Sequence, residues 1–256
     1  MDIKFLAGLC RTGQTLLSTI LKQNPKIYTE TQSPLCELMW QTHLTCNHDG
    51  VIKEAKSSSR DDIEKTLLTA LPKTYYKDVK QPIIIDRCKH WTSNINFNMA
   101  SNYITSSPKM VVTIRPLEDI VKSLLSLKTS YGMQVYTEYE IFEENTNPLT
   151  LSLQNLYELI TTKKEGKDYL LVNYNDLVDS PKKIITDIYS FYEIESYNHN
   201  FENIQSSYTI DDDIYGIKDI HKVDNKIIKK DKKDIELSSF ALAQINNIQK
   251  QIKVQW

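Results

Sequence analysis

The residues best suited to chemistry lie in the stretch GLCRTGQT near the start of the chain. Glycines let backbone N–H groups approach an anion closely, and a helix that begins there adds the positive end of its dipole. The spacing of Gly8, Gly13 and Thr15 matches the nucleotide-triphosphate loop G-x-x-x-x-G-K-[ST]. Gln14 replaces the lysine of that motif, and Arg11 supplies a cation nearer the start of the loop. The loop therefore predicts a site for an anion other than a magnesium-bound triphosphate.

A second candidate anion site follows the later apolar stretch SPKMVVTI, which ends at Arg115. Pro116 is favoured in the first turn of a helix, and Glu118 and Asp119 are favoured near its positive end. Ser123 comes eight residues after Arg115, about two helical turns along, so its hydroxyl can face the same edge of a sheet. Arg115 and Ser123 are therefore candidate ligands of a second anionic group.

Alternating strand and helix patterns supply the elements that must position these residues. Strands are predicted at residues 3–7, 26–31, 81–86, 107–114 and 168–173, and those at 3–7, 81–86 and 107–114 are expected to be buried. Helices are predicted at residues 15–23, from Pro34 onward with Leu35, Leu38, Met39 and Trp40 towards the core, at 63–71, from Pro116 onward, and at 151–161, 182–192 and 235–251. We expect a mobile surface connection at 48–62 and an acidic turn at 139–147. The alternation predicts an α/β fold with a mostly parallel central sheet flanked by helices.

Length and composition restrict the class of protein. The chain has 256 residues, of which 40% are hydrophobic, so it can bury one core as a single domain. Its net charge of -2 argues against a general nucleic-acid binder. The four cysteines show no C-x-x-C spacing, and a strand that starts at residue 3 leaves no room for a signal peptide, which together predict a cytoplasmic location. No apolar run approaches the ~20 residues of a membrane span.

Three segments together resemble the sulfotransferase family. The segment Phe5 to Leu17, FLAGLCRTGQTLL, resembles that family's 5′-phosphosulfate loop. Arg115 with Ser123, within residues 111–123, resembles its 3′-phosphate motif. Residues 174–181, YNDLVDSP, are similar to a Y-E-D-L…P segment of the family, and a weaker similarity lies at 216–223. The resemblance implies a P-loop-like nucleotide-binding fold, with one sulfotransferase-like domain over residues 1–256 and a helical C-terminal part at 197–256.

The resemblance also implies a reaction and its ligands. The expected donor is 3′-phosphoadenosine 5′-phosphosulfate, whose sulfuryl group passes to a hydroxyl or amine and leaves adenosine 3′,5′-bisphosphate, with no metal. The implied donor contacts are Arg11, Thr12, Gly13, Gln14, Thr15, Leu16, Arg115, Ser123 and Tyr174, although packing is a better explanation of Tyr174 than contact with the adenine. Arg11 would also be catalytic, because a fixed cation stabilises the charge that develops on the leaving phosphate. The motif lysine reaches the β- and γ-phosphates of a triphosphate. Its replacement by Gln14 therefore agrees with a donor that has no β,γ-phosphate bridge.

Transfer to a hydroxyl needs a base that takes the acceptor's proton. Glu30 is the first candidate, because a short strand could return it to the rim of the loop and it resembles a glutamate found after the same helix in some Golgi sulfotransferases. His90 is the second, because it follows a buried strand and comes directly after Lys89. His43 and His221 are the next histidines to consider.

Two other functions remain compatible with the same residues. One is a nucleotide kinase or hydrolase with a degenerate loop, and the other is a non-catalytic nucleotide-binding protein. The motifs do not identify the acceptor, so sugars, lipids, peptides and small phenols all stay open, as does the oligomeric state. The lysine-rich run 226–233 either covers a phosphate or forms a solvated face, and the acidic run 211–213 is a solvated loop rather than a metal site.

Overall fold

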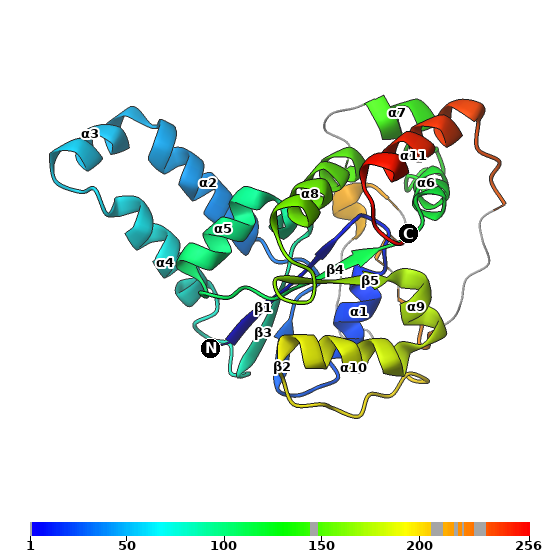
Figure 1. Cartoon of the computed structure of the whole chain (residues 1–256), viewed down its shortest axis with the longest axis horizontal. Coiled ribbons are helices and arrows are strands. Elements are labelled where there is room, and N and C mark those ends of the chain that lie inside the picture. The colour runs from blue at the N-terminus through cyan, green and yellow to red at the C-terminus, as the bar shows by residue number, and fades with distance from the viewer. Residues whose placement is uncertain (1, 144–147, 206–211, 218–219, 222, 228–233) are drawn as a thin grey trace.

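The computed structural model of the chain describes residues 2–143, 148–205, 212–217, 220–221, 223–227 and 234–256. Strands and helices alternate along most of this length (Figure 1). The elements are β1 (Asp2–Gly8), α1 (Gln14–Leu21), β2 (Ile27–Thr29), α2 (Leu35–His48), α3 (Gly50–Ser58), α4 (Ile63–Tyr75), β3 (Ile83–Arg87), the 3₁₀ helix η1 (Lys89–Thr92), α5 (Asn94–Tyr103), β4 (Met110–Ile114), α6 (Leu117–Leu125), α7 (Glu138–Glu143), α8 (Pro148–Thr162), β5 (Tyr169–Asn173), α9 (Tyr174–Asp179), α10 (Pro181–Tyr192), the 3₁₀ helix η2 (Asp212–Tyr215) and α11 (Ser239–Gln251).

The five strands form one parallel sheet in the order β2-β3-β1-β4-β5. Gly8 at the end of β1 pairs with Thr113, and Leu6 pairs with Arg87. Because all strands run the same way, their carboxyl ends meet at one edge of the sheet, where such sheets bind ligands. The predicted α/β fold with a parallel central sheet is therefore confirmed, and its central strand carries the glycine loop.

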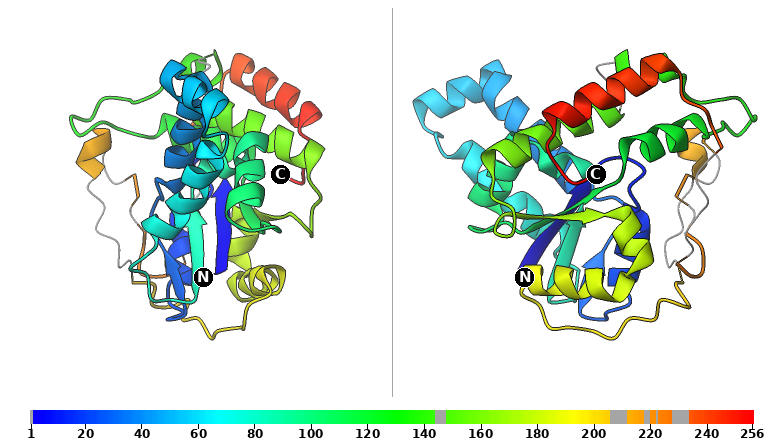
Figure 2. Two further views of the ribbon diagram at one scale, coloured as in Figure 1. Left: turned by 90° about the vertical axis from the view of Figure 1, so that its left-hand side faces the viewer. Right: turned by 45° about the vertical axis from the view of Figure 1, so that its right-hand side comes forward.

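The sheet is buried on both faces, which explains its runs of apolar residues. Successive side chains of a strand point to opposite faces, so each strand contributes to two cores. One core contains Phe5, Ala7, Ile84, Met110 and Val112 with residues of α2, α5, α6, α8 and α11. The other contains Leu6, Ile85, Val111 and Val172 with residues of α1, α9 and α10. Figure 2 shows α10 and the α2–α4 segment well apart, on opposite sides of the molecule.

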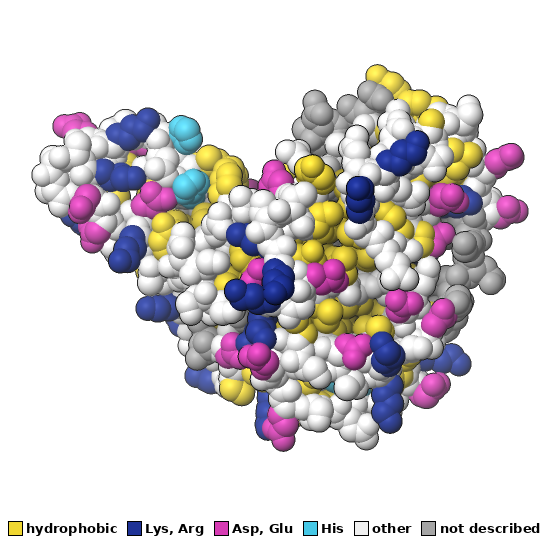
Figure 3. Space-filling model, in the orientation of Figure 1, with side chains coloured by type: hydrophobic (Ala, Val, Ile, Leu, Met, Phe, Trp, Pro, Cys, Tyr) yellow, Lys and Arg dark blue, Asp and Glu magenta, His cyan; other side chains and the backbone are white. Residues whose placement is uncertain are grey.

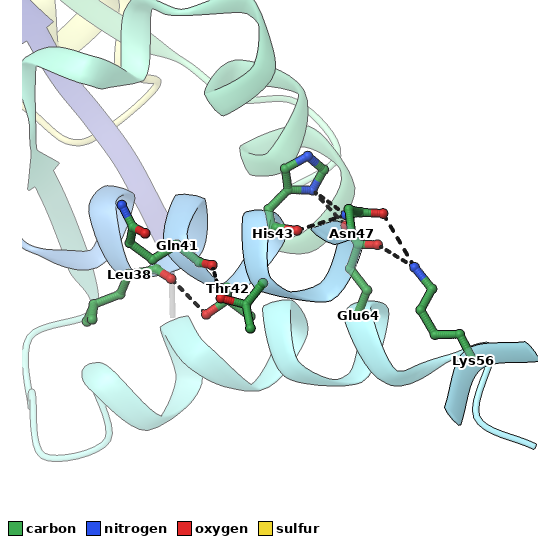
Figure 4. A network of polar contacts seen from close by, with 8 residues as sticks. Leu38, Gln41, Thr42, His43, Asn47, Lys56 and Glu64 are labelled. Carbon is green, nitrogen blue, oxygen red and sulfur yellow. Dashed lines mark hydrogen bonds and ion pairs between the residues drawn. The ribbon is translucent and has the colours of Figure 1, made fainter. Parts of the chain in front are cut away.

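Helices α2, α3 and α4 project from the body as a helical arm (Figure 1). A polar network holds them together (Figure 4). The Glu64 carboxylate lies 2.7 Å from His43 Nδ1 and 3.3 Å from Lys56 Nζ, and Asn47 donates to the His43 carbonyl at 2.8 Å. Burial acts to raise the pKa of Glu64, but the interactions of its carboxylate with His43, Asn47 and Lys56 together lower it. His43 therefore has a structural partner within the arm.

Several elements differ from the sequence prediction. The expected mobile connection at 48–62 contains the helix α3, and the expected acidic turn at 139–147 overlaps α7. Helices α5 and α9 form where no helix was predicted, and α4 continues past residue 71 through Pro72 to Tyr75. The expectation that Leu38 packs in the core is wrong, because Leu38 is 44% exposed. Leu35 and Met39 are buried, as expected.

The C-terminal part from residue 197 contains η2 and α11 among its described residues. Of the lysine-rich run, residues 228–233 lie outside the described residues, and so does Asp211. A β-bridge between Thr129 and Ile217 connects this C-terminal part to the rest of the fold. Across the described chain, no helix has the length and apolar character needed to cross a membrane.

Candidate active site

The glycine loop between β1 and α1 has the backbone of a phosphate cradle. Gly8 has φ +141°, and a Cβ there would lie 2.3 Å from the Thr113 carbonyl oxygen. Gly13 is the N-cap of α1 with φ +78°, and a Cβ there would lie 2.5 Å from the Tyr174 ring. Arg11 also has a positive φ, +60°. Since no side chain caps α1, its first backbone N–H groups can donate hydrogen bonds to an anion.

Two loop side chains support the loop itself. The Thr12 hydroxyl is buried, donates to the Leu9 carbonyl at 2.6 Å and lies 2.6 Å from the Thr113 hydroxyl. The Gln14 amide donates to the same Leu9 carbonyl at 3.0 Å. Leu16 packs against the core on the α1 side of the sheet. Any contact from Thr12 or Leu16 to a ligand would therefore come from the backbone.

Arg11 joins the loop to helix α6 and to the C-terminal part. Its Nε donates to Ser123 Oγ at 3.1 Å, and its Nη1 donates to the Ile220 carbonyl at 2.8 Å. Burial lowers the pKa of Arg11, and the neighbouring Arg115 cation acts in the same direction. The residues of the two predicted anion sites thus lie together, and an anion bound between the two guanidinium groups would relieve their repulsion.

Arg115 stands over the Tyr174 ring, with Cζ 4.6 Å from the ring centroid. Its Nη1 donates to the Arg11 carbonyl at 3.5 Å, and its Nε lies 3.7 Å from Asp119 Oδ2. That Nε is buried and has no hydrogen-bond partner among the described residues. Buried donors normally have a partner, so this one is an observation that fits an anionic ligand. Tyr174 packs between Gly13 and Arg115, which orients both.

Arg87, at the end of β3, is a site residue that the sequence reasoning passed over. It is only 8% exposed, and its Nη2 donates to Thr15 Oγ1 at 2.9 Å while Nη1 lies 3.5 Å from Ser18 Oγ. The buried guanidinium of Arg87 thus contacts the start of α1 through the hydroxyl groups of Thr15 and Ser18. Arg87 follows the three isoleucines and Asp86 at the predicted carboxyl end of a buried strand, and this position was a signal that could have identified it as a candidate.

Asp86, the neighbour of Arg87, is completely buried and fixes the segment that follows β3. It accepts hydrogen bonds from Ser33 Oγ at 2.8 Å, Tyr76 Oη at 2.6 Å and Trp91 Nε1 at 2.6 Å. Burial raises the pKa of Asp86, and these three donors oppose that shift. The carboxyl group thereby ties β3 to η1 and to the helical arm, and it orients the turn that carries His90.

The first candidate base, Glu30, lies just after β2 and is held by two tyrosines. Tyr28 Oη donates to one carboxylate oxygen at 2.6 Å, and Tyr75 Oη donates to the other at 2.6 Å. Burial raises the pKa of Tyr75, and the hydrogen bond to Glu30 adds to the shift, so the tyrosine keeps its proton. Each carboxylate oxygen retains a second lone pair, so the group can still accept a proton.

The second candidate base, His90, lies in η1, which packs against β1. Its ring makes no hydrogen bond to the part of the chain that the structure describes, and its carbonyl accepts from Asn96 Nδ2 at 2.8 Å. Burial lowers the pKa of His90, and the adjacent Lys89 cation acts in the same direction, so the imidazole is neutral at pH 7. In the sheet order, β3 lies beside β1 and β2 lies one strand further away.

The two remaining candidate histidines, His43 and His221, differ in position. His43 belongs to the helical arm and binds Glu64 (Figure 4). His221 is adjacent to Ile220, whose carbonyl binds Arg11, and its Nδ1 lies 2.7 Å from Asp212 Oδ1. Thus His221 lies near the loop and His43 does not. Among the described residues, no group of three or more His, Cys, Asp or Glu side chains is placed to hold a metal ion.

A parallel α/β sheet with a glycine loop and two arginines at its carboxyl edge is typical of proteins that bind the phosphate groups of nucleotides. A model of the sulfotransferase family matches residues 5–199, and the chain belongs to this family. No curated protein matches it. The resemblance predicted from the sequence is therefore confirmed, and the protein is a sulfotransferase enzyme.

Solved structures share this fold at low sequence identity. The sulfotransferase domain from the olefin synthase of Synechococcus PCC 7002 has a TM-score of 0.62 and 17% identity, covering 100% of this chain and 96% of that chain. The sulfotransferase domain from the curacin biosynthetic pathway gives 0.60 and 13%, covering 99% and 98%. A sulfotransferase from Alicyclobacillus acidocaldarius gives 0.56 and 10%, covering 100% and 98%.

Proposed function

We propose that this sulfotransferase uses 3′-phosphoadenosine 5′-phosphosulfate as its donor and a hydroxyl or amine as its acceptor. The observation that carries the proposal is the meeting of Arg11 and Arg115 beside Ser123, with a buried Arg115 Nε that has no partner among the described residues. A donor with phosphates at both the 5′ and the 3′ position needs two such cationic groups close together. The family match supports sulfuryl transfer in general.

The glycine loop would hold the 5′ side of the donor. The N–H groups of Gly13, Gln14 and Thr15 stand at the start of α1, where the helix dipole favours negative charge. Arg87 binds the Thr15 hydroxyl and so fixes its direction. When bound, the donor supplies an activated sulfuryl group, and cleavage of its sulfur–oxygen bond leaves a more highly charged phosphate. Arg11 and the loop N–H groups would stabilise this charge more strongly in the transition state than before it.

Arg115 and Ser123 would hold the 3′-phosphate. Arg115 Nε has a free hydrogen-bonding direction, and its guanidinium is kept in place by the Tyr174 ring. Ser123 Oγ accepts from Arg11, which leaves its own hydroxyl proton to donate to a phosphate oxygen. Tyr174 thus acts through Arg115 and Gly13, as a positioning residue of the donor site.

Glu30 and His90 remain the two candidate bases. The base would take the proton of the acceptor as the acceptor oxygen or nitrogen bonds to sulfur. His90 is neutral and lies after β3, next to the loop-bearing strand, whereas Glu30 is firmly oriented by two tyrosines one strand further away. Both roles are testable by substitution.

Gln14 supports this donor over a magnesium-bound triphosphate. Its side chain donates to the Leu9 carbonyl, so a neutral amide folded into the loop occupies the position of the motif lysine. We therefore propose chemistry that needs no metal. The cysteines Cys10, Cys36, Cys46 and Cys88 are all free, which supports the proposed cytoplasmic location.

Calorimetry with adenosine 3′,5′-bisphosphate and adenosine 5′-phosphate, in the presence of a chelator, tests the donor. We expect the bisphosphate to bind at least tenfold more tightly, since only it engages both arginines. Equal affinities would refute the two-phosphate assignment. Binding that requires magnesium would favour the kinase alternative, and binding without transfer from labelled donor to a pool of sugars, lipids, peptides and phenols would favour the non-catalytic one.

A further inference from the structure

Thr113 lies in β4 beside the start of the glycine loop, and its side chain is completely buried. Its register partner is Gly8 at the end of β1. A Cβ on Gly8 would lie 2.3 Å from the Thr113 carbonyl oxygen and 2.4 Å from the Thr113 hydroxyl oxygen. Because the two backbones approach so closely, only glycine fits opposite Thr113, and the position of Thr113 sets where the loop begins.

Thr113 contacts the loop through both its backbone and its side chain. The Leu9 N–H donates to the Thr113 carbonyl at 3.1 Å. The Leu9 carbonyl accepts from the Thr12 hydroxyl at 2.6 Å and from the Gln14 amide at 3.0 Å. The Thr12 hydroxyl lies 2.6 Å from the Thr113 hydroxyl. One residue of β4 therefore holds both Leu9 and Thr12.

The direction of the hydrogen bond between the two threonines follows from their protons, because a hydroxyl group has only one proton to donate. Thr12 donates its proton to the Leu9 carbonyl, so the Thr113 hydroxyl is the donor to the Thr12 oxygen. The Ala7 carbonyl is a second possible acceptor for Thr113, but at the longer distance of 3.4 Å. The result is a chain of two hydrogen bonds from Thr113 through Thr12 to Leu9, in which each bond polarises the next.

Thr113 also connects the two groups of residues that would bind the donor. Arg115 comes two residues after Thr113 along the chain, and its Nη1 donates to the Arg11 carbonyl at 3.5 Å. Arg11 directly precedes Thr12, which accepts the hydrogen bond from Thr113. Thr113 thus joins the loop proposed for the 5′ side of the donor to the strand end that carries the arginine proposed for its 3′-phosphate.

The distribution of charge makes the geometry of this loop important for donor binding. The chain has a net charge of -2. On the face that it views, Figure 3 shows Lys and Arg side chains interspersed with Asp and Glu side chains over the helical arm and the body of the molecule. A mixed surface of this kind gives a nucleotide little general attraction. Affinity for the donor therefore depends on hydrogen-bond donors that are fixed in place before it binds, as the N–H groups of a rigid loop are.

We propose that Thr113 is a positioning residue of sulfuryl transfer, which holds the glycine loop, through Thr12 and Leu9, in the conformation that binds the 5′ side of the nucleotide. The inference rests on the proposed function and adds to it a residue that acts on the donor only through the loop. Valine has nearly the shape of threonine but no hydroxyl proton. Thr113→Val therefore keeps the packing against Gly8 but leaves Thr12 bonded to Leu9 alone, so the loop N–H groups are held less firmly.

Calorimetry with adenosine 5′-phosphate and adenosine 3′,5′-bisphosphate tests this inference. Thr113→Val should weaken both nucleotides by the same factor, about fivefold, as the loss of one buried hydrogen bond predicts, because the loop would contact the 5′-phosphate that both share. Thr113→Ser keeps the hydroxyl and should restore both affinities to within about twofold of the wild type. Thr29→Val is the matched control, because Thr29 is also buried in a strand but lies in the edge strand β2, and it should leave both affinities unchanged.

A second variant tests the same hydrogen bond from its other partner. Thr12→Val removes the acceptor of the Thr113 proton and should weaken both nucleotides at least as much as Thr113→Val. The double variant Thr12→Val/Thr113→Val should lose no more affinity than Thr12→Val alone, because the shared hydrogen bond can be removed only once. Additive losses in the double variant would overturn the inference.

Turnover and thermal unfolding separate positioning from a purely structural role. Turnover at saturating donor should fall by roughly tenfold or more in Thr113→Val, since small displacements of a bound substrate are costly, while Tm stays within about 4 °C of the wild type. A lower Tm with unchanged affinities and turnover, or a loss of affinity for the bisphosphate alone, would overturn the inference while the proposed function stands. A wild-type protein that binds neither nucleotide would instead refute the proposed function, and the inference with it.

Discussion

Arg11 Nε donates a hydrogen bond to Ser123 Oγ at 3.1 Å, across 112 residues of sequence. The contact joins the glycine loop after β1 to the helix after β4, the two places where the sequence predicted separate anion sites. Because β1 and β4 are neighbours in a parallel sheet, their carboxyl ends deliver both groups to one location. The residues of the two predicted anion sites are therefore in direct contact, as the proposed binding of one two-phosphate ligand requires.

Replacing Arg115 by alanine should selectively remove the affinity that the 3′-phosphate of the nucleotide contributes. We expect adenosine 3′,5′-bisphosphate to bind about 2–3 kcal/mol more weakly, the value of a lost charge-assisted hydrogen bond, with adenosine 5′-phosphate nearly unaffected. Calorimetry measures both affinities. Arg60→Ala is the control, since that side chain is 54% exposed on the helical arm. Equal losses for both nucleotides would show that Arg115 does not read the 3′-phosphate.

Replacing Arg87 by lysine should weaken the interactions with the 5′ side of the nucleotide. The lysine keeps the charge but loses the geometry that reaches Thr15 Oγ1 and Ser18 Oγ together, so we expect kcat/KM for the donor to fall by roughly 10–100-fold. Adenosine 5′-phosphate and the bisphosphate should then lose affinity by similar factors, in contrast to Arg115→Ala. A thermal-unfolding scan shows whether the variant remains folded. Unchanged kinetics in a folded variant would assign Arg87 to structure alone.

Much of the fold was accessible from the sequence, because runs of β-branched residues identify strands that are buried on both faces. The pattern of Ile83, Ile84 and Ile85 is an example. Helix α3 was missed because its sequence is mostly polar and none of its residues is buried, although Asp49 caps it by accepting from the Ile52 N–H at 3.1 Å. Helix α5 was missed for a related reason, since its segment is rich in asparagine and its cap is Ser93.

The residues of the candidate site could be predicted from the sequence only where they belong to a local motif. The loop glycines and Arg115 follow from strand-to-helix patterns, and the structure brings them together with Ser123. The position of Arg87 after a buried strand was visible in the sequence, but its contacts with Ser18 and Thr15 were not, because these partners lie 69 and 72 residues away. The same holds for the bond from Arg11 to Ile220, which spans 209 residues. Contacts of this kind depend on packing rather than on spacing in the sequence.

Conservative substitutions separate the two candidate bases. Glu30→Gln or His90→Asn, whichever residue is the base, should lower turnover by roughly 10²–10⁴ with nucleotide affinity changed less than about twofold. Single-turnover kinetics with labelled donor and calorimetry provide the two readouts. If both variants retain near-normal turnover, neither residue is the base, and His221→Asn would be the next variant, with His43→Asn as the control on the helical arm.

The pH dependence gives an independent test of His90. Its pKa is lowered from the ordinary value of 6.5, so the neutral imidazole that accepts a proton persists below that pH and is lost only as the pH falls through the lowered pKa. We therefore expect the acid limb of kcat/KM for the free enzyme to have its midpoint below pH 6.5 if His90 is the base. A midpoint above 6.5, or an unchanged limb in His90→Asn, would argue against this role.

Gln14 leads to a prediction about triphosphates. We expect no hydrolysis of ATP, because a neutral amide bound to the Leu9 carbonyl takes the place of the lysine that reaches the β- and γ-phosphates. Phosphate release in the presence of magnesium measures this directly. Measurable hydrolysis that Gln14→Ala abolishes would indicate a triphosphate-binding loop.

We expect sulfuryl transfer from 3′-phosphoadenosine 5′-phosphosulfate to proceed without a metal. To measure it, the protein is incubated with ³⁵S-labelled donor, a pool of hydroxyl and amine acceptors and excess chelator, and the products are separated by chromatography. Equal amounts of labelled sulfated acceptor and adenosine 3′,5′-bisphosphate are the predicted result. Label that stays on the donor or appears only as free sulfate, or transfer that stops when magnesium is removed, would contradict the account.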